Sequence, residues 1–125
     1  MKYLVMVFFL SLTQIACDSN NTDELADKQK RLVELQASID SLIADKSCNG
    51  VGDCASIAFG SKPCGGPWSY LVYAPSNVDE NLLQQLVNEY NQVQDEVNIL
   101  TNAASDCAFV QEPQLSCESN ECKAI

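Results

Sequence analysis

Histidine is absent from this chain of 125 residues. Its absence removes the commonest general base and the commonest zinc ligand, and it argues against catalysis of the Cys–His and Ser–His–acid kinds. The chain also has no two cysteines at the C-x2-C spacing that is typical of zinc sites. We therefore predict a protein that is not an enzyme and that has no metal and no cofactor.

Basic residues are few. Seven Lys and Arg stand against 17 Asp and Glu, which gives a formal net charge of −10. Proteins bind nucleic acid largely by neutralising phosphates, so we expect no nucleic-acid partner for such an acidic chain. The charge indicates a well-solvated surface, and the length suits a single domain.

The chain begins with a short apolar run. Tyr3–Leu10 follows the basic Lys2, and it is too short to span a bilayer comfortably, since a spanning helix needs about 20 residues. A basic start, an apolar run and a small residue before a boundary predict a signal peptide over residues 1–16. An ordinary signal peptide, with Cys17 paired to another cysteine, is one interpretation.

The other interpretation comes from Ile15-Ala16-Cys17. This sequence resembles the end of a bacterial lipobox, where the signal is cut before a cysteine that has received a diacylglycerol. The resemblance implies lipidation of Cys17 and a tether over residues 17–21. The lipid would attach the protein to a membrane of the bacterial cell envelope, outside the cytoplasm. The resemblance covers only residues 1–17, and we expect the rest of the chain, residues 22–125, to form one disulfide-stabilised domain.

Cysteine is frequent for a chain of this length. With Cys17 set aside for lipid, six cysteines remain, and an even number in an exported chain predicts three disulfides. Six cysteines allow 15 pairings, and the sequence does not choose among them. Geometry ranks three pairings first, across a hairpin, between helix ends and across the central turn: Cys117–Cys122, Cys48–Cys107 and Cys54–Cys64.

Aliphatic residues recur at helical spacing in two stretches. Leu25, Leu32 and Ile39 lie seven apart and predict a helix that ends near Ala44. A stripe from Leu83 to Leu100 predicts a second helix over about 78–102, after a break and cap at residues 74–77. The first stripe has two interpretations, a helix packed on its own domain or the seam of a coiled-coil dimer.

Alternating and branched residues predict five short strands. We expect them at Cys54–Gly60, Trp68–Tyr73, Ser105–Val110, Gln114–Cys117 and Cys122–Ile125. The predicted class is α+β, with two amphipathic helices packed on a small antiparallel sheet and stabilised by disulfides.

The loop over residues 60–70 is rich in residues that restrict or release the backbone. Two prolines fix φ, the Gly65-Gly66 pair permits positive φ, and a disulfide at Cys64 would pin the middle. A stiff loop favours binding, because it loses little entropy on docking. Disulfide-braced loops of protease inhibitors present an exposed lysine at the contact, a part that Lys62 would play here. The residues of this possible binding loop are Lys62, Pro63, Gly65, Gly66, Pro67, Trp68 and Tyr70. A turn that needs Gly and Pro for geometry alone is the alternative interpretation.

Residues 60–68 together with Tyr70–Tyr73 resemble a segment of small exported bacterial proteins and lipoproteins with no assigned activity. The resemblance implies one exported, disulfide-bonded domain and brings no catalytic residues. Two functions stay open. One is a binding module that presents the 60–70 loop to a protein or small ligand, and the other is a structural or assembly component of the envelope that acts through its helices. Exposed apolar surface on the loop would favour the first, and exposed surface along Leu25–Leu42 the second.

Overall fold

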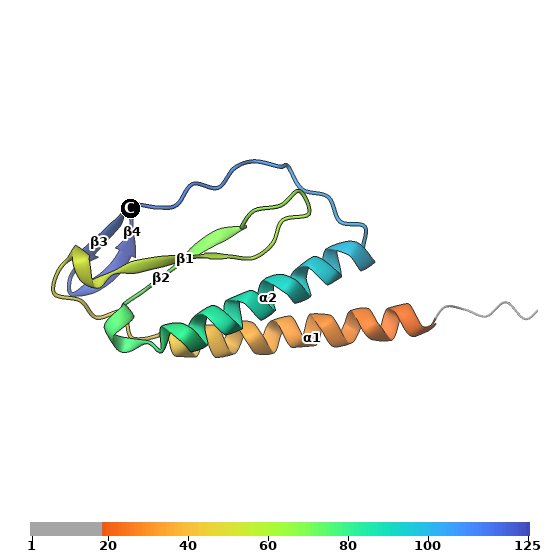
Figure 1. Cartoon of the computed structure of the whole chain (residues 1–125), viewed down its shortest axis with the longest axis horizontal. Coiled ribbons are helices and arrows are strands. Elements are labelled where there is room, and N and C mark those ends of the chain that lie inside the picture. Colours follow the sequence, from red (N-terminus) through yellow and green to blue (C-terminus); the bar gives the residue numbers. More distant parts are fainter. Residues whose placement is uncertain (1–18) are drawn as a thin grey trace, which may run out of the picture.

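A computed structural model describes residues 19–125 of the chain (Figure 1). The elements follow in the order α1 (Ser19–Leu42), β1 (Ala55–Phe59), β2 (Ser69–Tyr73), α2 (Glu80–Leu100), β3 (Leu115–Glu118) and β4 (Glu121–Ala124). Short 3₁₀ turns, η1 (Val51–Asp53) and η2 (Pro75–Asn77), precede β1 and α2. The α+β class is as the sequence predicts. The predicted signal segment and Cys17 lie outside the described residues.

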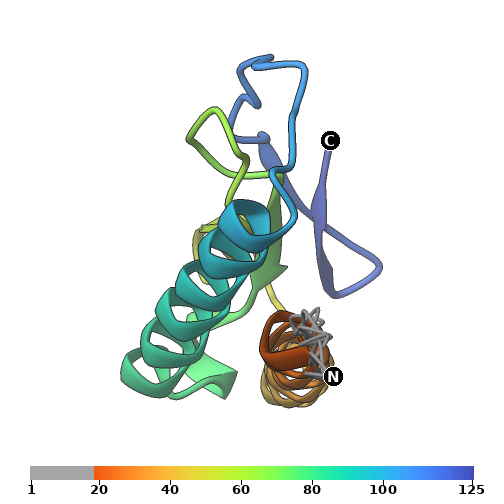
Figure 2. The same cartoon turned by 90° about the vertical axis from the view of Figure 1, so that its right-hand side faces the viewer.

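The two helices run antiparallel and side by side (Figures 1 and 2). Their apolar stripes meet, and Leu35, Ile39, Leu83 and Val87 are the largest fully buried side chains. Where the N-terminal half of α1 lies beside the C-terminal end of α2, the ammonium of Lys28 lies 2.7 Å from the Glu96 carboxylate. From Leu35 onwards, the stripe of α1 is therefore covered by α2 and the β1–β2 hairpin, whereas Leu25 and Leu32 are half-buried.

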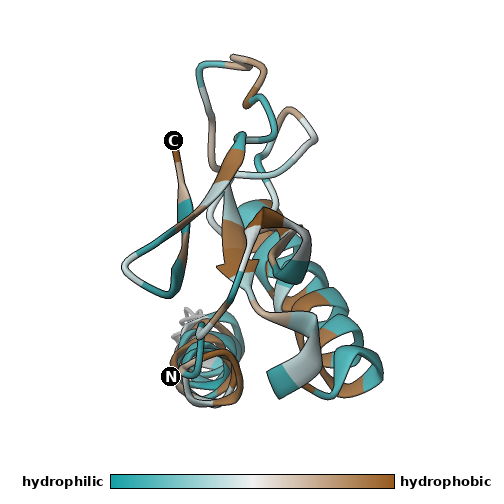
Figure 3. Cartoon of the chain, turned by 90° about the vertical axis from the view of Figure 1, so that its left-hand side faces the viewer, coloured by the Kyte–Doolittle hydropathy of each residue, from teal (hydrophilic) through white to brown (hydrophobic). Residues whose placement is uncertain are grey.

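The β1–β2 hairpin forms a middle layer. Its strands are antiparallel, with Ile57 opposite Leu71. One face, which includes Ile57, Phe59 and Tyr73, joins the helices in the main core. The other face places Val72 in a second core with Cys48, Ala74 and Cys122. Figure 3 shows the hydropathy behind this arrangement, with α2 banded brown and teal along its length.

The sheet differs from the single one expected, because β1–β2 and β3–β4 form two separate two-stranded sheets. β4 bonds instead to the chain that follows α1. The Cys48 amide donates to the Asn120 carbonyl, and the Cys122 amide donates to the Lys46 carbonyl. Those backbone groups satisfy one edge of the β3–β4 hairpin, so it does not need β1 or β2 as a neighbour.

Three boundaries also differ from expectation. Residues 105–110 form no strand, and residues 101–114, here called the strap, cross the domain in irregular extended backbone. The cap of α2 is Asp79, which accepts a hydrogen bond from the Leu82 amide, while residues 75–77 form the turn before it. At the start of the described chain, helix α1 begins at Ser19, so it includes residues that the sequence assigned to the tether.

The six cysteines of residues 19–125 are all joined in disulfides, which confirms the predicted number of three bonds. The ranked pairing is wrong, because the bonds are Cys48–Cys117, Cys54–Cys122 and Cys64–Cys107. Cys117 and Cys122 do lie opposite each other in β3–β4. The segment after α1 packs against that hairpin, however, and brings a closer partner to each.

These disulfides indicate a protein that folds outside the reducing cytoplasm. Across residues 19–125, neither helix combines the length and the apolar character needed to cross a membrane.

Candidate binding site at the central loop

The central loop (residues 60–68) joins β1 to β2 and closes on itself. The Gly65 amide donates to the Lys62 carbonyl at 2.8 Å, and the Lys62 amide donates to the Gly66 carbonyl at 2.9 Å. Both glycines have positive φ, 94° and 81°, which residues with a side chain adopt with strain. The positive φ angles that the sequence predicts for this glycine pair are confirmed.

Helix α2 holds the start of the loop through amide side chains. Asn91 accepts from the Gly60 amide at 2.8 Å, Gln94 accepts from the Ser61 amide, and Asn98 donates to the Ser61 carbonyl at 2.9 Å. The three amides stand three and four residues apart, which is the helical spacing that signals a shared face.

Lys62 is buried, with 4% of its side chain exposed. Its ammonium donates to Asp106 at 3.1 Å and to the Ala108 carbonyl at 2.8 Å, and it lies 5.0 Å from the centre of the Trp68 ring. The sequence-based expectation of an exposed contact lysine is therefore wrong for this residue. The Lys62 ammonium contacts groups inside the domain, and these contacts join the central loop to the strap.

On the strap, the residues that contact Lys62 form a small turn from Asp106 to Ala108. The Ala108 amide donates to the Asp106 carboxylate at 3.0 Å. That amide, and after it the Lys62 ammonium, hold the pKa of Asp106 below its usual range, because both stabilise the ionised carboxylate. Beside them the Cys64–Cys107 disulfide joins the same two segments covalently.

Further along, the strap runs antiparallel to β1. Lys62 meets Asp106, and Ser56 meets Glu112 through a 2.6 Å hydrogen bond. The two pairs are in antiparallel register. Within residues 19–125, however, side chains and the Cys64–Cys107 disulfide join the strap to β1 and the central loop. This explains why alternating residues there did not become a strand.

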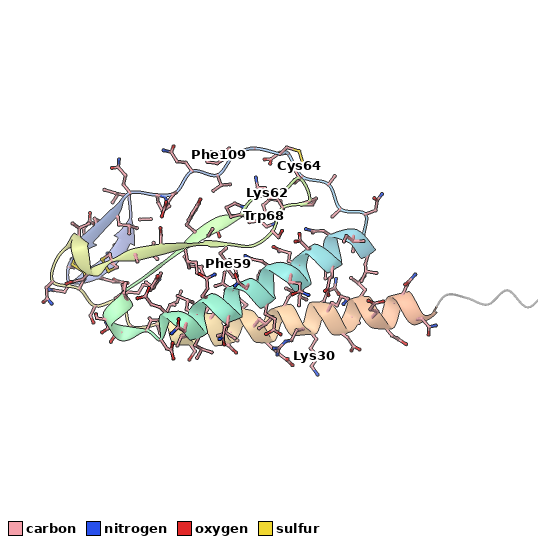
Figure 4. The ribbon with its side chains drawn as sticks, in the orientation of Figure 1. Lys30, Phe59, Lys62, Cys64, Trp68 and Phe109 are labelled. Carbon is pink, nitrogen blue, oxygen red and sulfur yellow. A yellow bond between two sulfur atoms is a disulfide. The ribbon has the colours of Figure 1, made fainter. Side chains whose placement is uncertain are left out.

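Two aromatic side chains remain open to solvent at this end of the molecule. Trp68 is 44% exposed and Phe109 is 87% exposed. The Trp68 ring is fixed by its indole N–H, which donates to the Ser61 carbonyl at 3.1 Å. Figure 4 shows Lys62, Trp68 and Cys64 together, with Phe109 nearby on the strap.

The other predicted loop residues contribute differently. Gly65 and Gly66 are exposed at the tip, whereas Pro63, Pro67 and Tyr70 are half-buried. Phe109 was missed as a contact candidate, because the sequence placed it in a strand and gave no signal of its exposure. The arrangement is a stiff tip with an accessible disulfide, a glycine pair and two apolar rings.

A second group of cysteines lies at the opposite end of the hairpins. The sulfurs of Cys48, Cys54 and Cys122 lie within 4.8 Å of one another. Sulfurs at that spacing would suit a soft metal ion if they were thiolates. Here each sulfur belongs to a disulfide, so none is a thiolate ligand.

Comparisons of the chain with protein-family models, with curated proteins and with solved structures found no match.

Proposed function

We propose that this chain is a lipid-anchored protein of the bacterial cell envelope whose domain is a non-enzymatic binding module. Lipid on Cys17 would hold it at the membrane, and the central loop with the neighbouring strap would contact a partner protein or small ligand. The observation that carries the proposal is the exposure of Trp68 and Phe109 on backbone that hydrogen bonds and a disulfide hold in place. Rigid aromatic side chains supply contact area at low entropic cost.

The alternative, an assembly component acting through its helices, has less support. Leu35 and Ile39, in the apolar stripe of α1, are fully buried. The exposed apolar residues on the helices, Val33, Leu82 and Ile99, are single positions, and scattered apolar residues are normal on a soluble surface.

The contact surface is tested by quantitative capture from a bacterial envelope extract with Phe109→Ala. Phe109 is almost fully exposed, so its removal leaves the fold intact. The amount of partner that this variant retains should be about tenfold lower, or less, than the amount that the wild-type chain retains. This is the effect expected for an aromatic contact worth at least ~1.4 kcal/mol.

Val33→Ala is the matched control, because Val33 is 71% exposed on α1, away from the loop. It should bind like the wild type. Loss with Val33→Ala alone would favour assembly through the helices, and equal capture by every variant would contradict a binding role for the loop.

The anchor is tested separately with Cys17→Ser. The variant should lose membrane attachment. An unmodified Cys17 in the mature wild-type protein, or a different mature start, would rule out the lipid anchor without bearing on the binding surface.

A further inference from the structure

The cysteine cluster consists of Cys48, Cys54, Cys117 and Cys122, which form two disulfides against the β3–β4 hairpin. Two observations show that these two disulfides lie close to each other. The sulfurs of Cys48, Cys54 and Cys122 lie within 4.8 Å of one another, although they belong to two different bonds. Cys117 and Cys122, also from different bonds, are opposite each other in the register of β3 and β4.

Access to the cluster is uneven. Cys48 and Cys122 are 5% and 2% exposed, while Cys54 and Cys117 are half-buried. Each disulfide therefore joins one buried cysteine to one half-buried cysteine, and an external thiol can reach the half-buried one more easily. Thiol–disulfide exchange needs a thiolate and a reachable disulfide sulfur.

We propose that this cluster is a thiol–disulfide exchange site, in which an external thiol allows the two bonds to swap partners. The external thiolate attacks the sulfur of Cys117, the Cys48–Cys117 bond breaks, and its electron pair leaves with Cys48 as a thiolate. The Cys48 thiolate then attacks Cys54, which forms Cys48–Cys54 and expels Cys122 as a thiolate.

The last step closes the cycle. The Cys122 thiolate attacks Cys117, which still carries the external thiol, and the external thiolate leaves as Cys117–Cys122 forms. Two disulfides are broken and two are made, the external thiol is regenerated, and there is no net oxidation or reduction.

The swap would change what the bonds connect. The present bonds have sequence separations of 69 and 68 and hold the β3–β4 hairpin to the chain after α1. The swapped bonds would be local, within the 48–54 segment and within the hairpin. The hairpin would then keep only its non-covalent contacts with the rest of the domain.

The test uses the full chain with Cys17→Ser, so that no seventh thiol competes, and adds Cys48→Ser to leave Cys117 unpaired. The native-state thiol is alkylated over time, and the labelled cysteines and remaining bonds are mapped by mass spectrometry. We expect label on both Cys117 and Cys54, together with a Cys117–Cys122 bond. The exchange should be about eightfold faster at pH 8 than at pH 7, because the thiolate fraction of a thiol with the ordinary pKa of about 8.5 rises in that proportion.

The matched control is Cys64→Ser, which leaves Cys107 unpaired at the other end of the molecule. Its label should stay on Cys107. Label confined to Cys117 in the first variant would overturn the proposal, and label that spreads equally in the control would also overturn it, because exchange would then reflect general opening of the domain.

A second arm removes the dependence on how well Cys48→Ser folds. The chain with all six paired cysteines is incubated with a small amount of glutathione under native conditions. Peptides linked through Cys117–Cys122 and Cys48–Cys54 should appear. Their absence, with the original bonds intact, would overturn the proposal as well.

Discussion

At the scale of single residues, Lys62 decides how the central loop meets the strap. Its buried ammonium donates to Asp106 and to the Ala108 carbonyl. We expect Lys62→Met, which keeps most of the volume, to lower the free energy of unfolding by ~1–3 kcal/mol, the usual cost of losing hydrogen bonds from a charged group. Thermal unfolding followed by circular dichroism measures this change.

The control for that substitution is Lys30→Met. Lys30 is exposed on α1 and points away from the fold (Figure 4), so the change should be within about 0.5 kcal/mol. Equal destabilisation by the two variants would mean that the Lys62 contacts contribute nothing specific.

Asp106 makes the same contact sensitive to acid. Its pKa in the folded protein is lowered, chiefly by the Ala108 amide and then by Lys62, so its ionised form favours the native strap. The contribution is therefore present above the ordinary value of 3.8 and is lost as the pH falls through the lower folded pKa. The fluorescence of Trp68, the only tryptophan, should change in that range as the Lys62 ammonium loses its partner. Asp106→Asn should lack this change, and a wild-type curve identical to that of the variant would contradict the assignment.

At the scale of the elements, Gly60 controls how closely the loop approaches α2. It has φ of 83°, and an added Cβ would lie 3.0 Å from the Trp68 side chain and 3.1 Å from Gln94. Gly60→Ala should therefore destabilise the domain by ~1–3 kcal/mol, the cost typical of a strained backbone position. Gly52→Ala, where an added Cβ meets nothing within 4 Å, should change stability by less than about 0.5 kcal/mol. Chemical denaturation of both variants gives the comparison.

The elements with a strong periodic pattern could be predicted from the sequence. The helices and the strands of both hairpins lie where the aliphatic stripes and alternation place them, to within a few residues. The strap could not be predicted, because alternation in the sequence does not show whether the backbone of a segment pairs with a neighbouring strand. Ser105–Val110 has alternating residues, but the side chains of Lys62 and Cys64 hold this segment beside the central loop.

The candidate site was predictable only in part for a related reason. The pair Gly65 and Gly66 predicts a tight turn, because glycine adopts the positive φ angles that such a turn needs. The burial of Lys62 depends on Asp106, 44 residues away, and no local pattern encodes that distance. The exposure of Phe109 follows from the path of the strap and has no local signal either.

At the scale of the whole molecule, three disulfides join residues 107–122 to residues 48–64. Sequence spacing could give their number but not their pairing. The bonds form where separate segments pack, and Cys117 lies opposite Cys122 yet bonds to Cys48. The covalent framework therefore follows the tertiary fold rather than the local turns.

The same framework predicts an order of reduction. Cys64 of the central loop and Cys107 of the strap are both exposed residues, whereas each of the other bonds includes Cys48 or Cys122, residues that are at most 5% exposed. Because attack by a thiol requires access to sulfur, a limiting amount of dithiothreitol under native conditions should reduce Cys64–Cys107 first, about tenfold faster than either of the others. Alkylation and peptide mapping at successive times would show label on Cys64 and Cys107 before any other cysteine.

Loss of this bond should also have a thermodynamic signature. It closes a span of 43 residues, for which loop-closure entropy gives ~4 kcal/mol. The Lys62 contacts lie within the same junction and would still hold the strap after reduction, so the protein should remain folded with a lower Tm. Simultaneous labelling of all six cysteines would instead mean that reduction follows global unfolding, and that the exposed bond at the tip is not independently accessible.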